Sequence, residues 1–305
     1  MAVDVAIFLE GQNGLNWGNW KRIVRSVEDL GFAGLYRSDH FTNMRPPNID
    51  SLELWISLAW LADNTSRIEF GQLVSPISFR NPIFAARMAK DLDDLSGGRF
   101  ILGLGAGWQE HEHEKFGFDL LKIGPRFDRF EEGVEVVHRL LKSEGPVSFS
   151  GEYYHLNEAE LLPRPQRKGG PPILIGGRGR KRTLPLIARL ADEWNMGFRP
   201  AETFAALNAY LDELLESEGR RPEEIRRTIA NTIVFGRDDR EVKRKIEESD
   251  YSEDEIKKLG MIVGTGQKIA DRIGEYEEAG AQRVMLQWLD LDDLDGLEAL
   301  AKAIL

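Results

Sequence analysis

The chain of 305 residues contains no cysteine. Disulfide bonds, thiolate catalysis and cysteine-bound metal sites are therefore excluded, although this absence leaves the cellular compartment open. Excess positive charge is also missing, because the formal net charge is −11, and a general nucleic-acid partner is not expected. An anionic ligand would have to be bound by a local basic cluster.

Long apolar runs are absent too, and none approaches the roughly 20 residues that a membrane-spanning helix needs. The first residues, MAVDVAIFLEG, have no basic leader and only a short apolar run, unlike a secretory signal. We therefore expect a soluble, cytoplasmic protein with no membrane partner. No internal repeat is visible, so a solenoid or propeller is not expected.

Short apolar segments typical of buried strands alternate with segments of helical spacing along most of the chain. The expected strands cover residues 3–9, 33–36, 68–74, 100–104, 173–175, 193–196, 228–235 and 283–288. Eight such units predict an α/β fold of the (β/α)8 TIM-barrel type, with a doubly wound sheet as the alternative. We expect a single domain over residues 1–305, with insertions at about 145–172 and 238–262.

Polar residues follow the expected strands, at the end of a barrel where active sites form. Asp39 and His40 come directly after the second strand, and residues 72–75 end the third. His40 could donate or accept a proton near neutral pH, with Asp39 orienting it or acting itself. The alternative is that Asp39 and His40 only cap a loop.

Three alternate glycines, Gly103, Gly105 and Gly107, follow the apolar run 100–104 and precede Trp108. Glycines at the end of a strand leave room for a flat ligand to approach the backbone, although packing is an equally good explanation. The spacing GxGxG is not the GxGxxG of dinucleotide-binding folds, so it is a weak nucleotide signal. Trp108 is either a wall of a site or an ordinary packed aromatic.

The segment IGGRGRKRT, residues 175–183, gathers glycines and basic residues at the expected start of a helix. Cations there oppose the helix dipole, and a bound anion would relieve that conflict and use the free backbone N–H groups. Phosphate is the expected anion, and a solvated basic cluster is the alternative. The segment His111–Glu114 does not match a metal-binding HExxH pattern, so we expect a solvated helix start and no metal.

Four segments together resemble the luciferase-like monooxygenase superfamily, and within it most closely the coenzyme F420-dependent oxidoreductases. They are SDHF at residues 38–41, the run SPISFRNPIFAARMAKDLDDLSGGRFILGLGAGW at 75–108, ILIGGRGRKRTLPLIARLADEWN at 173–195 and VGTGQKIADRIGEYEEAGAQRVML at 263–286. The resemblance covers nearly the whole chain in register. It implies a TIM-type barrel that holds the deazaflavin F420, or alternatively FMN, at the carboxyl ends of its strands.

The resemblance assigns proton handling to His40 and Asp39 and implies a non-proline cis peptide between Gln72 and Leu73. The residues that it places around the cofactor are Gln72, Leu73, Ser75, Gly105, Ala106, Gly107 and Trp108 near the ring and Gly176, Gly177, Arg178, Gly179 and Arg180 at the phosphate. The implied activity is hydride transfer between F420 and a small organic molecule.

One departure from the family bears on the substrate. Trp108 stands where F420-dependent sugar-phosphate dehydrogenases have a catalytic glutamate, so a sugar phosphate is not expected. An apolar or flat substrate is expected instead, bounded by Trp17, Phe41, Trp108 and the insertion at 145–172. An FMN-dependent monooxygenase and a non-catalytic flavin-binding protein are the alternatives, and a homodimer stays open.

Overall fold

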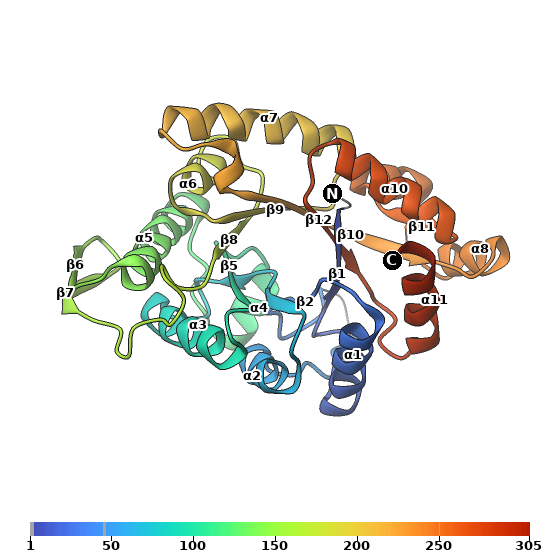
Figure 1. Ribbon diagram of the computed structural model, residues 1–305, viewed down its shortest axis with the longest axis horizontal. Coiled ribbons are helices and arrows are strands. Elements are labelled where there is room, and N and C mark those ends of the chain that lie inside the picture. Colours follow the sequence, from blue (N-terminus) through green and yellow to red (C-terminus); the bar gives the residue numbers. More distant parts are fainter. Residues whose placement is uncertain (1–2, 45–46, 250) are drawn as a thin grey trace.

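Parallel strands joined by helical crossovers close on themselves in the computed structural model, which describes residues 3–44, 47–249 and 251–305 (Figure 1). The strands of the barrel are β1 (Asp4–Leu9), β2 (Gly34–Arg37), β3 (Glu69–Gln72), β5 (Phe100–Gly105), β8 (Ile173–Gly176), β9 (Glu193–Gly197), β10 (Arg226–Phe235) and β12 (Arg283–Gln287). Pairing of β9 with β10 and of β12 with β1 completes the circle. The predicted (β/α)8 barrel is therefore confirmed, and the doubly wound sheet is excluded.

Helices pack around the outside of these strands (Figure 1). The crossover helices are α1 (Trp17–Leu30), α2 (Leu54–Asn64), α3 (Pro82–Ser96), α5 (Ile123–Lys142), α6 (Thr183–Leu190), α7 (Ala201–Ser217), α10 (Gly266–Glu278) and α11 (Leu294–Ile304). Their ends follow from the sequence. In α3, for example, the Asn81 side chain caps the start, Pro82 occupies the first turn, and Gly97 ends the helix at a φ of 70°. No helix within the described residues is long and apolar enough to cross a membrane.

The two insertions lie at opposite ends of the barrel. Residues 145–172 contain the hairpin of β6 (Val147–Ser150) and β7 (His155–Ala159). Arg167 from this segment pairs with Asp93 at 3.0 Å and also donates to the Gly98 carbonyl, just before β5 begins. The first insertion therefore lies at the amino ends of the strands, and the expectation that it bounds a substrate at the mouth is wrong. The physical reason is that it joins a helix to the next strand.

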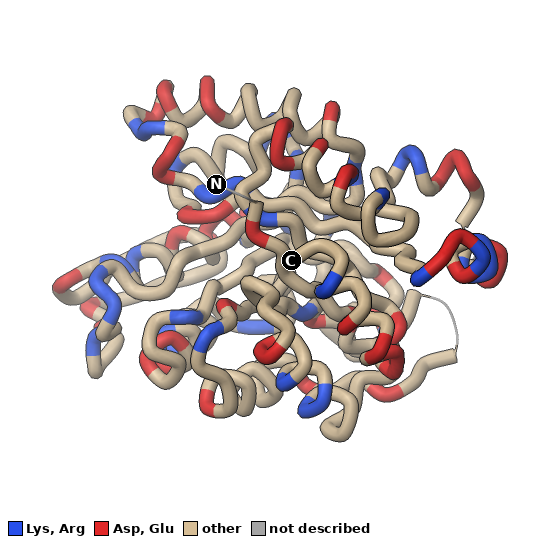
Figure 2. Tube along the Cα trace, turned by 45° about the vertical axis from the view of Figure 1, so that its right-hand side comes forward, with Lys and Arg blue, Asp and Glu red and all other residues tan. Residues whose placement is uncertain are grey.

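The second insertion follows β10 and lies at the carboxyl ends of the strands. It consists of α8 (Asp239–Glu248), α9 (Glu253–Leu259) and the short strand β11 (Ile262–Gly264), which extends the sheet by pairing with the end of β10. Acidic and basic residues are interspersed along these outer helices (Figure 2). Three i,i+4 ion pairs within α8 explain why so polar a segment is helical; they are Glu241–Lys245, Lys243–Glu247 and Arg244–Glu248.

An ion cluster closes the amino end of the barrel. Its members are mostly the first residues of their strands: Glu69 of β3, Glu193 of β9, Arg226 of β10 and Arg283 of β12. The Glu69 carboxylate lies 2.6 Å from Arg283 and 2.8 Å from Arg226. Glu193 is only 2% exposed and lies 3.9 Å from Arg226. Burial raises the pKa of Glu193 to about 7, and the two arginines offset only part of that effect.

Above this cluster, alternate side chains of the strands fill the barrel with a small apolar layer, and the opposite faces pack against the helices. The residues of the inner layer are Ala6, Phe8, Tyr36, Ile101, Leu174, Ala230 and Met285, all at most 3% exposed. This layer separates the ion cluster from the carboxyl ends of the strands.

We predict that Glu193→Gln changes how stability depends on pH. The folded-state pKa of Glu193 lies above its ordinary value of 4.5. Its favourable contribution to the free energy of unfolding is therefore complete below about pH 4.5 and is lost by about pH 7. An amide cannot ionise, so the variant should gain up to about 3 kcal/mol relative to the wild type between pH 4.5 and 8, at about 1.4 kcal/mol per pKa unit. Urea unfolding at several pH values measures this difference.

Glu69→Gln serves as the control from the same cluster. The pKa of Glu69 is lowered, because its arginine partners outweigh the effect of its burial. Its contribution is therefore present above pH 4.5, and the variant should be less stable throughout the range. An unchanged pH slope in Glu193→Gln would contradict the prediction.

Candidate active site

A bulge interrupts the third strand at the carboxyl end of the barrel. Gly71 pairs with Ile101 and Ser75 pairs with Leu104, so four steps along one strand face three along β5. The extra residue lies between β3 and β4 (Ser75–Pro76). Such bulges redirect the backbone next to active sites.

The non-proline cis peptide of this bulge joins Leu73 to Val74, so the expected position between Gln72 and Leu73 is wrong by one residue. The reason is that the hydrogen bonds between β2 and β3 continue as far as the N–H group of Leu73. Gln72 pairs with Arg37, and its side-chain Oε1 accepts the Gly103 N–H at 3.1 Å. The Leu73 N–H donates to the Arg37 carbonyl at 2.7 Å.

Glycines within the carboxyl-terminal parts of β5 and β8 make room for this bulge. A Cβ atom on Gly103 would collide with the Gln72 carbonyl oxygen. A Cβ atom on Gly105 would lie 2.5 Å from Val74 Cγ2, and one on Gly176 would lie 3.1 Å from Val74 Cγ1. The space beside these glycines, which the sequence suggested for a flat ligand, is thus occupied by Val74. The bulge places Leu73 and Val74 at the mouth of the barrel.

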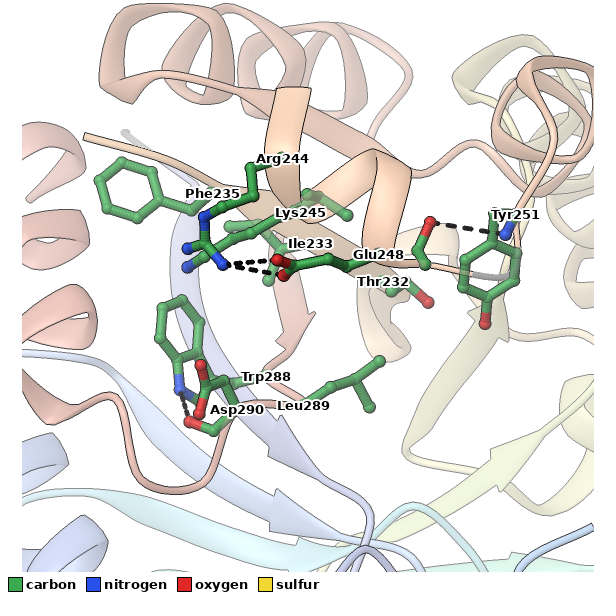
Figure 3. A pocket seen from close by; sticks show the side chains of 12 residues that line it. Thr232, Ile233, Phe235, Arg244, Lys245, Glu248, Tyr251, Trp288, Leu289 and Asp290 are labelled. Carbon is green, nitrogen blue, oxygen red and sulfur yellow. Dashed lines mark hydrogen bonds and ion pairs between the residues drawn. The ribbon is translucent and has the colours of Figure 1, made fainter. Parts of the chain in front are cut away.

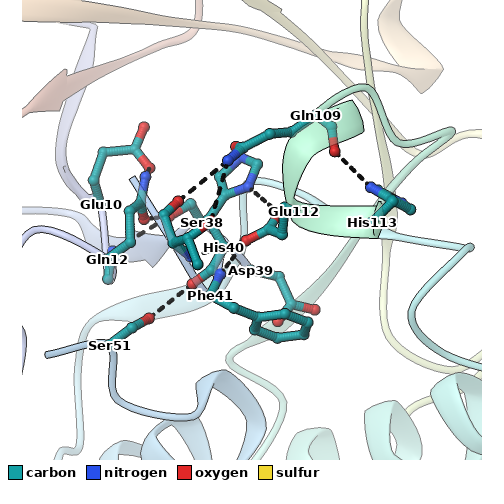
Figure 4. A network of polar contacts seen from close by, with 12 residues as sticks. Glu10, Gln12, Ser38, Asp39, His40, Phe41, Ser51, Gln109, Glu112 and His113 are labelled. Atoms are coloured by element: carbon teal, nitrogen blue, oxygen red, sulfur yellow. Dashed lines mark hydrogen bonds and ion pairs between the residues drawn. The ribbon is translucent and has the colours of Figure 1, made fainter. Parts of the chain in front are cut away.

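His40 is held at the mouth by Glu112, a buried residue of the short helix α4 (Glu110–Phe116) (Figure 4). His40 Nδ1 lies 2.9 Å from Glu112 Oε2. The other carboxylate oxygen of Glu112 accepts the backbone N–H groups of Phe41 and Thr42, the latter at 3.0 Å. Glu112 thereby fixes both the loop after β2 and the His40 ring, whose side chain keeps 16% exposure.

This contact sets the protonation of both groups. Burial alone would lower the pKa of His40, but its hydrogen bond to Glu112 and the charges of Glu10, Glu112 and Asp39 raise it above the ordinary value. The pKa of Glu112 is lowered, because the His40 hydrogen bond and the two backbone donors outweigh its burial. With Nδ1 turned to a carboxylate, the Nε2 atom of His40 is the ring nitrogen left for proton transfer.

Glu112 and His113 were not expected to be buried, and the solvated helix start predicted for residues 111–114 is wrong at both. Glu112 is fully buried, and His113 is 2% exposed with Nε2 at 2.7 Å from the Ser78 hydroxyl. The reason lies in tertiary structure, because the loop after β2 supplies the donors that Glu112 accepts. The local pattern of a seven-residue polar helix contains no signal for this.

Asp39 does not orient His40. Its carboxylate is buried, accepts a hydrogen bond from the Ser75 hydroxyl at 2.6 Å, and lies 3.5 Å from Arg80. Burial raises the pKa of Asp39, and Arg80 and Ser75 offset part of the rise. Asp39 and Ser75 therefore fasten the loop after β2 to the bulge, and the side chain of Ser75 turns into the protein.

Aromatic side chains form the wall beside His40. The Trp108 ring, 55% exposed, meets the His40 ring edge-on with centroids 5.6 Å apart. Phe41 stacks on Phe79 at 4.7 Å. The structure thus brings His40, Phe41 and Trp108 together, as the sequence predicted for the mouth.

The turn after β8 carries free donors and cations. The backbone N–H groups of Arg178, Gly179 and Arg180 have no partner among the described residues. Gly177 has a φ of 133°, a conformation that favours glycine. The guanidinium of Arg178 forms no ion pair within the described ranges, and its pKa is lowered by burial and by the neighbouring charge of Arg199. Two arginines held close without a carboxylate favour an anion between them.

Other basic residues of the turn have partners in the protein. Arg182 pairs with Asp128 and Glu131 at 2.7 and 2.8 Å, so it fastens the turn to α5. Arg180 lies over the Tyr210 ring at 4.7 Å. Arg199 could not be found from the sequence, because it follows β9, about twenty residues from the basic cluster, and only the closure of the barrel brings the two strand ends together.

A chain of polar contacts lies across the mouth (Figure 4). Glu10 accepts hydrogen bonds from Gln12 at 2.9 Å and from Gln287 at 2.7 Å. Gln12 in turn accepts from the Ser38 hydroxyl at 3.0 Å. These contacts join the ends of β1, β2 and β12 and hold the Glu10 carboxylate where its charge acts on His40.

Comparison with known proteins gives a family. Residues 3–252 match the luciferase-like monooxygenase family. The chain is 30% identical over 221 residues to the F420-dependent glucose-6-phosphate dehydrogenase of Kineococcus radiotolerans, which covers 70% of this chain and 62% of that protein. It is 33% identical over 181 residues to the 4-hydroxyprotoasukamycin monooxygenase of Streptomyces nodosus subsp. asukaensis. That match covers 59% of this chain and 46% of the monooxygenase. It thus spans less than two thirds of these relatives.

A solved structure agrees with the fold. An F420-dependent secondary alcohol dehydrogenase in complex with an F420–acetone adduct superposes with a TM-score of 0.86 over the whole of both chains, at 19% identity. At that identity the likeness shows the barrel fold alone.

We predict that Arg199→Ala weakens binding of a phosphate-bearing flavin, because Arg199 and Arg178 would both face the anion. The loss expected for a charge-assisted hydrogen bond is roughly 1–3 kcal/mol. Fluorescence titration with FMN and with riboflavin, which lacks the phosphate, measures the effect. Riboflavin affinity should not change, and Lys181→Ala, an exposed cation of the same turn, should have the smaller effect. An equal loss for both flavins would contradict an anion site.

We also predict that Glu112→Gln lowers the pKa of His40, because a neutral amide replaces the carboxylate that stabilises the protonated ring. The amide oxygen can still accept the Phe41 and Thr42 N–H groups, so the loop should stay in place. Titration of the histidine ring signals by NMR, with His40→Ala used for assignment, measures the shift. The exposed Glu114→Gln on the same helix is the control, and an unchanged His40 pKa in Glu112→Gln would refute the pairing.

Proposed function

The chain belongs to the luciferase-like monooxygenase family, and from this premise we propose that it is an oxidoreductase that transfers hydride between bound coenzyme F420 and a small neutral organic molecule. The observation that carries the proposal is the pair of His40 and Glu112 at the mouth of the barrel. Its position supports acid–base chemistry next to a redox ring. Names of relatives support F420 as the cofactor.

The mouth fits an anionic, ring-bearing cofactor. The unpaired N–H groups of residues 178–180 and the guanidinium groups of Arg178 and Arg199 would hold its phosphate. The bulge at Leu73 and Val74 would support the ring from behind, and Trp108 would lie at its edge. When bound, the deazaflavin supplies the hydride, since it carries carbon where a flavin carries nitrogen at the reacting position.

The residues of this chain would manage the proton that accompanies hydride transfer. Reduction of a carbonyl needs a proton at the oxygen, and protonated His40 would donate it from Nε2. Glu112 on Nδ1 favours the protonated ring and so keeps this donor charged near neutral pH. In the opposite direction, neutral His40 would accept the hydroxyl proton, and Glu112 would stabilise the imidazolium that forms.

Two other functions use the same barrel. An FMN-dependent monooxygenase would bind FMN, which reacts with oxygen, whereas a deazaflavin does not usefully activate oxygen, so the choice of cofactor separates the two functions. A non-catalytic flavin-binding protein would need the anion site but not the His40–Glu112 pair, and the exposed edge of His40 argues against it. A sugar-phosphate substrate is disfavoured by Trp108, and we propose a neutral one. A homodimer and a cytoplasmic location remain part of the proposal.

The test begins with cofactor choice. We predict that the purified protein binds F420 at least tenfold more tightly than FMN, a difference of about 1.4 kcal/mol. Fluorescence titration with both cofactors measures the two affinities. Equal or tighter binding of FMN would move the assignment to the monooxygenase.

Turnover separates an enzyme from a binding protein. Wild-type protein should oxidise reduced F420 in the presence of a suitable ketone or aldehyde, and His40→Ala should lower the rate by about 10²–10⁴-fold, as expected for loss of a general acid. F420 affinity should change much less, since the phosphate contacts lie on another strand. Tight F420 binding with no turnover of any acceptor would favour the storage function.

A further inference from the structure

A cavity of about 280 Å³ opens at the carboxyl ends of β10 and β12, beneath α8 of the second insertion (Figure 3). Its volume is close to the lower end of the roughly 300–1,000 Å³ typical of small-molecule pockets, so it suits one ring rather than a long chain. The apolar residues that line it are Ile233, Val234, Phe235, Trp288 and Leu289, with Tyr251 beside them.

Three of the four charged groups of the wall have ion-pair partners, and the fourth, Asp290, is exposed. Arg244 holds Glu248 through two contacts of 2.8 and 3.0 Å (Figure 3). Lys245 lies 3.3 Å from Asp293 and 3.5 Å from Glu241. An anionic ligand would have to break one of these pairs and would also meet the carboxylate of Asp290, so the cavity disfavours an anion, and its apolar walls favour a neutral ligand.

Trp288 presents a ring without a free donor. Its indole N–H donates to the Asp290 carbonyl at 2.7 Å, and the side chain is 4% exposed. A ligand therefore meets the apolar part of the indole and gains no hydrogen bond from it. Aromatic walls of this kind favour a flat or aromatic molecule.

One end of the cavity is polar and is connected to the proton-handling site. The buried Thr232 hydroxyl, which lines the cavity, donates to Gln287 Oε1 at 2.5 Å. Gln287 Nε2 donates to Glu10, whose charge contributes to the raised pKa of His40. Two hydrogen bonds thus link the cavity to the carboxylate of Glu10.

We propose that this cavity binds the apolar part of the substrate, a neutral molecule of about one aromatic or alicyclic ring with a single polar group directed to the Thr232 end. That the bound molecule is the substrate rests on the proposed function, whereas its binding to the cavity does not. The second insertion, which supplies α8, thereby determines specificity at the mouth, while the first insertion lies at the other end of the barrel.

Binding of acetophenone and of benzoate to the cofactor-free protein tests the proposal. The two probes share a ring and differ in charge. By calorimetry, acetophenone should bind the wild type at least tenfold more tightly than benzoate. Leu289→Trp places a larger side chain at the cavity and should weaken acetophenone binding at least tenfold. Leu289 is 38% exposed, so the folded state should tolerate the change. Leu162→Trp, on the first insertion, is the control and should not alter binding.

Glu248→Gln provides a second variant that does not depend on filling the cavity. It removes the partner of Arg244 at a site with 60% side-chain exposure, so folding should be unaffected. Benzoate affinity should then rise at least tenfold. The proposal is overturned if acetophenone does not bind the wild type, if Leu289→Trp and Leu162→Trp bind it equally, or if Glu248→Gln leaves benzoate affinity unchanged.

The F420 titration separates this proposal from the proposed function. F420 affinity of Leu289→Trp should equal that of the wild type. Acetophenone binding to the cavity with no F420 binding by any variant would reject the cofactor assignment and leave the cavity as a ligand site. F420 binding without acetophenone binding would reject the cavity alone.

Discussion

The carboxylate of Glu112 is the contact on which the arrangement of the mouth depends. One oxygen accepts two backbone N–H groups of the loop after β2, and the other contacts His40. A carboxylate so deeply buried is costly unless every lone pair finds a donor, and here the donors come from a different strand. The loops after β2 and β5 are therefore joined by a charged group, and neither can shift without leaving that charge unsatisfied.

The bulge imposes a second constraint that works through shape. Val74 occupies the space above Gly105 and Gly176, which belong to neighbouring strands. A Cβ atom at Gly105 would collide with Val74, and one at Gly176 would press against it. Meanwhile Asp39 and Ser75 connect the bulge to the loop that carries His40. The bulge and the loop that carries His40 are thus parts of one rigid unit.

The barrel itself could be predicted from the sequence, because strand and helix periodicity, proline starts and glycine ends are local signals. The strand predicted over 100–104, for example, is observed as Phe100–Gly105. The position of His40 and the glycine turn after β8 followed from the barrel rule together with the family resemblance. Glu112 and Arg199 could not be found in this way, because their partners lie 72 and about 20 residues away and meet them only after the sheet closes. The cis bond was predicted one residue too early, because Gln72 is still paired with Arg37 in the sheet. Such pairing with a distant strand cannot be recognised from the local sequence.

The hairpin of β6 and β7 is attached to the middle of α5, where Glu132 accepts the N–H groups of residues 152–154. The chain has no cysteine. A single thiol introduced at the exposed Asn157 would consequently be the only reactive sulfhydryl of the protein. A dye or a surface tether could be coupled there in one defined stoichiometry.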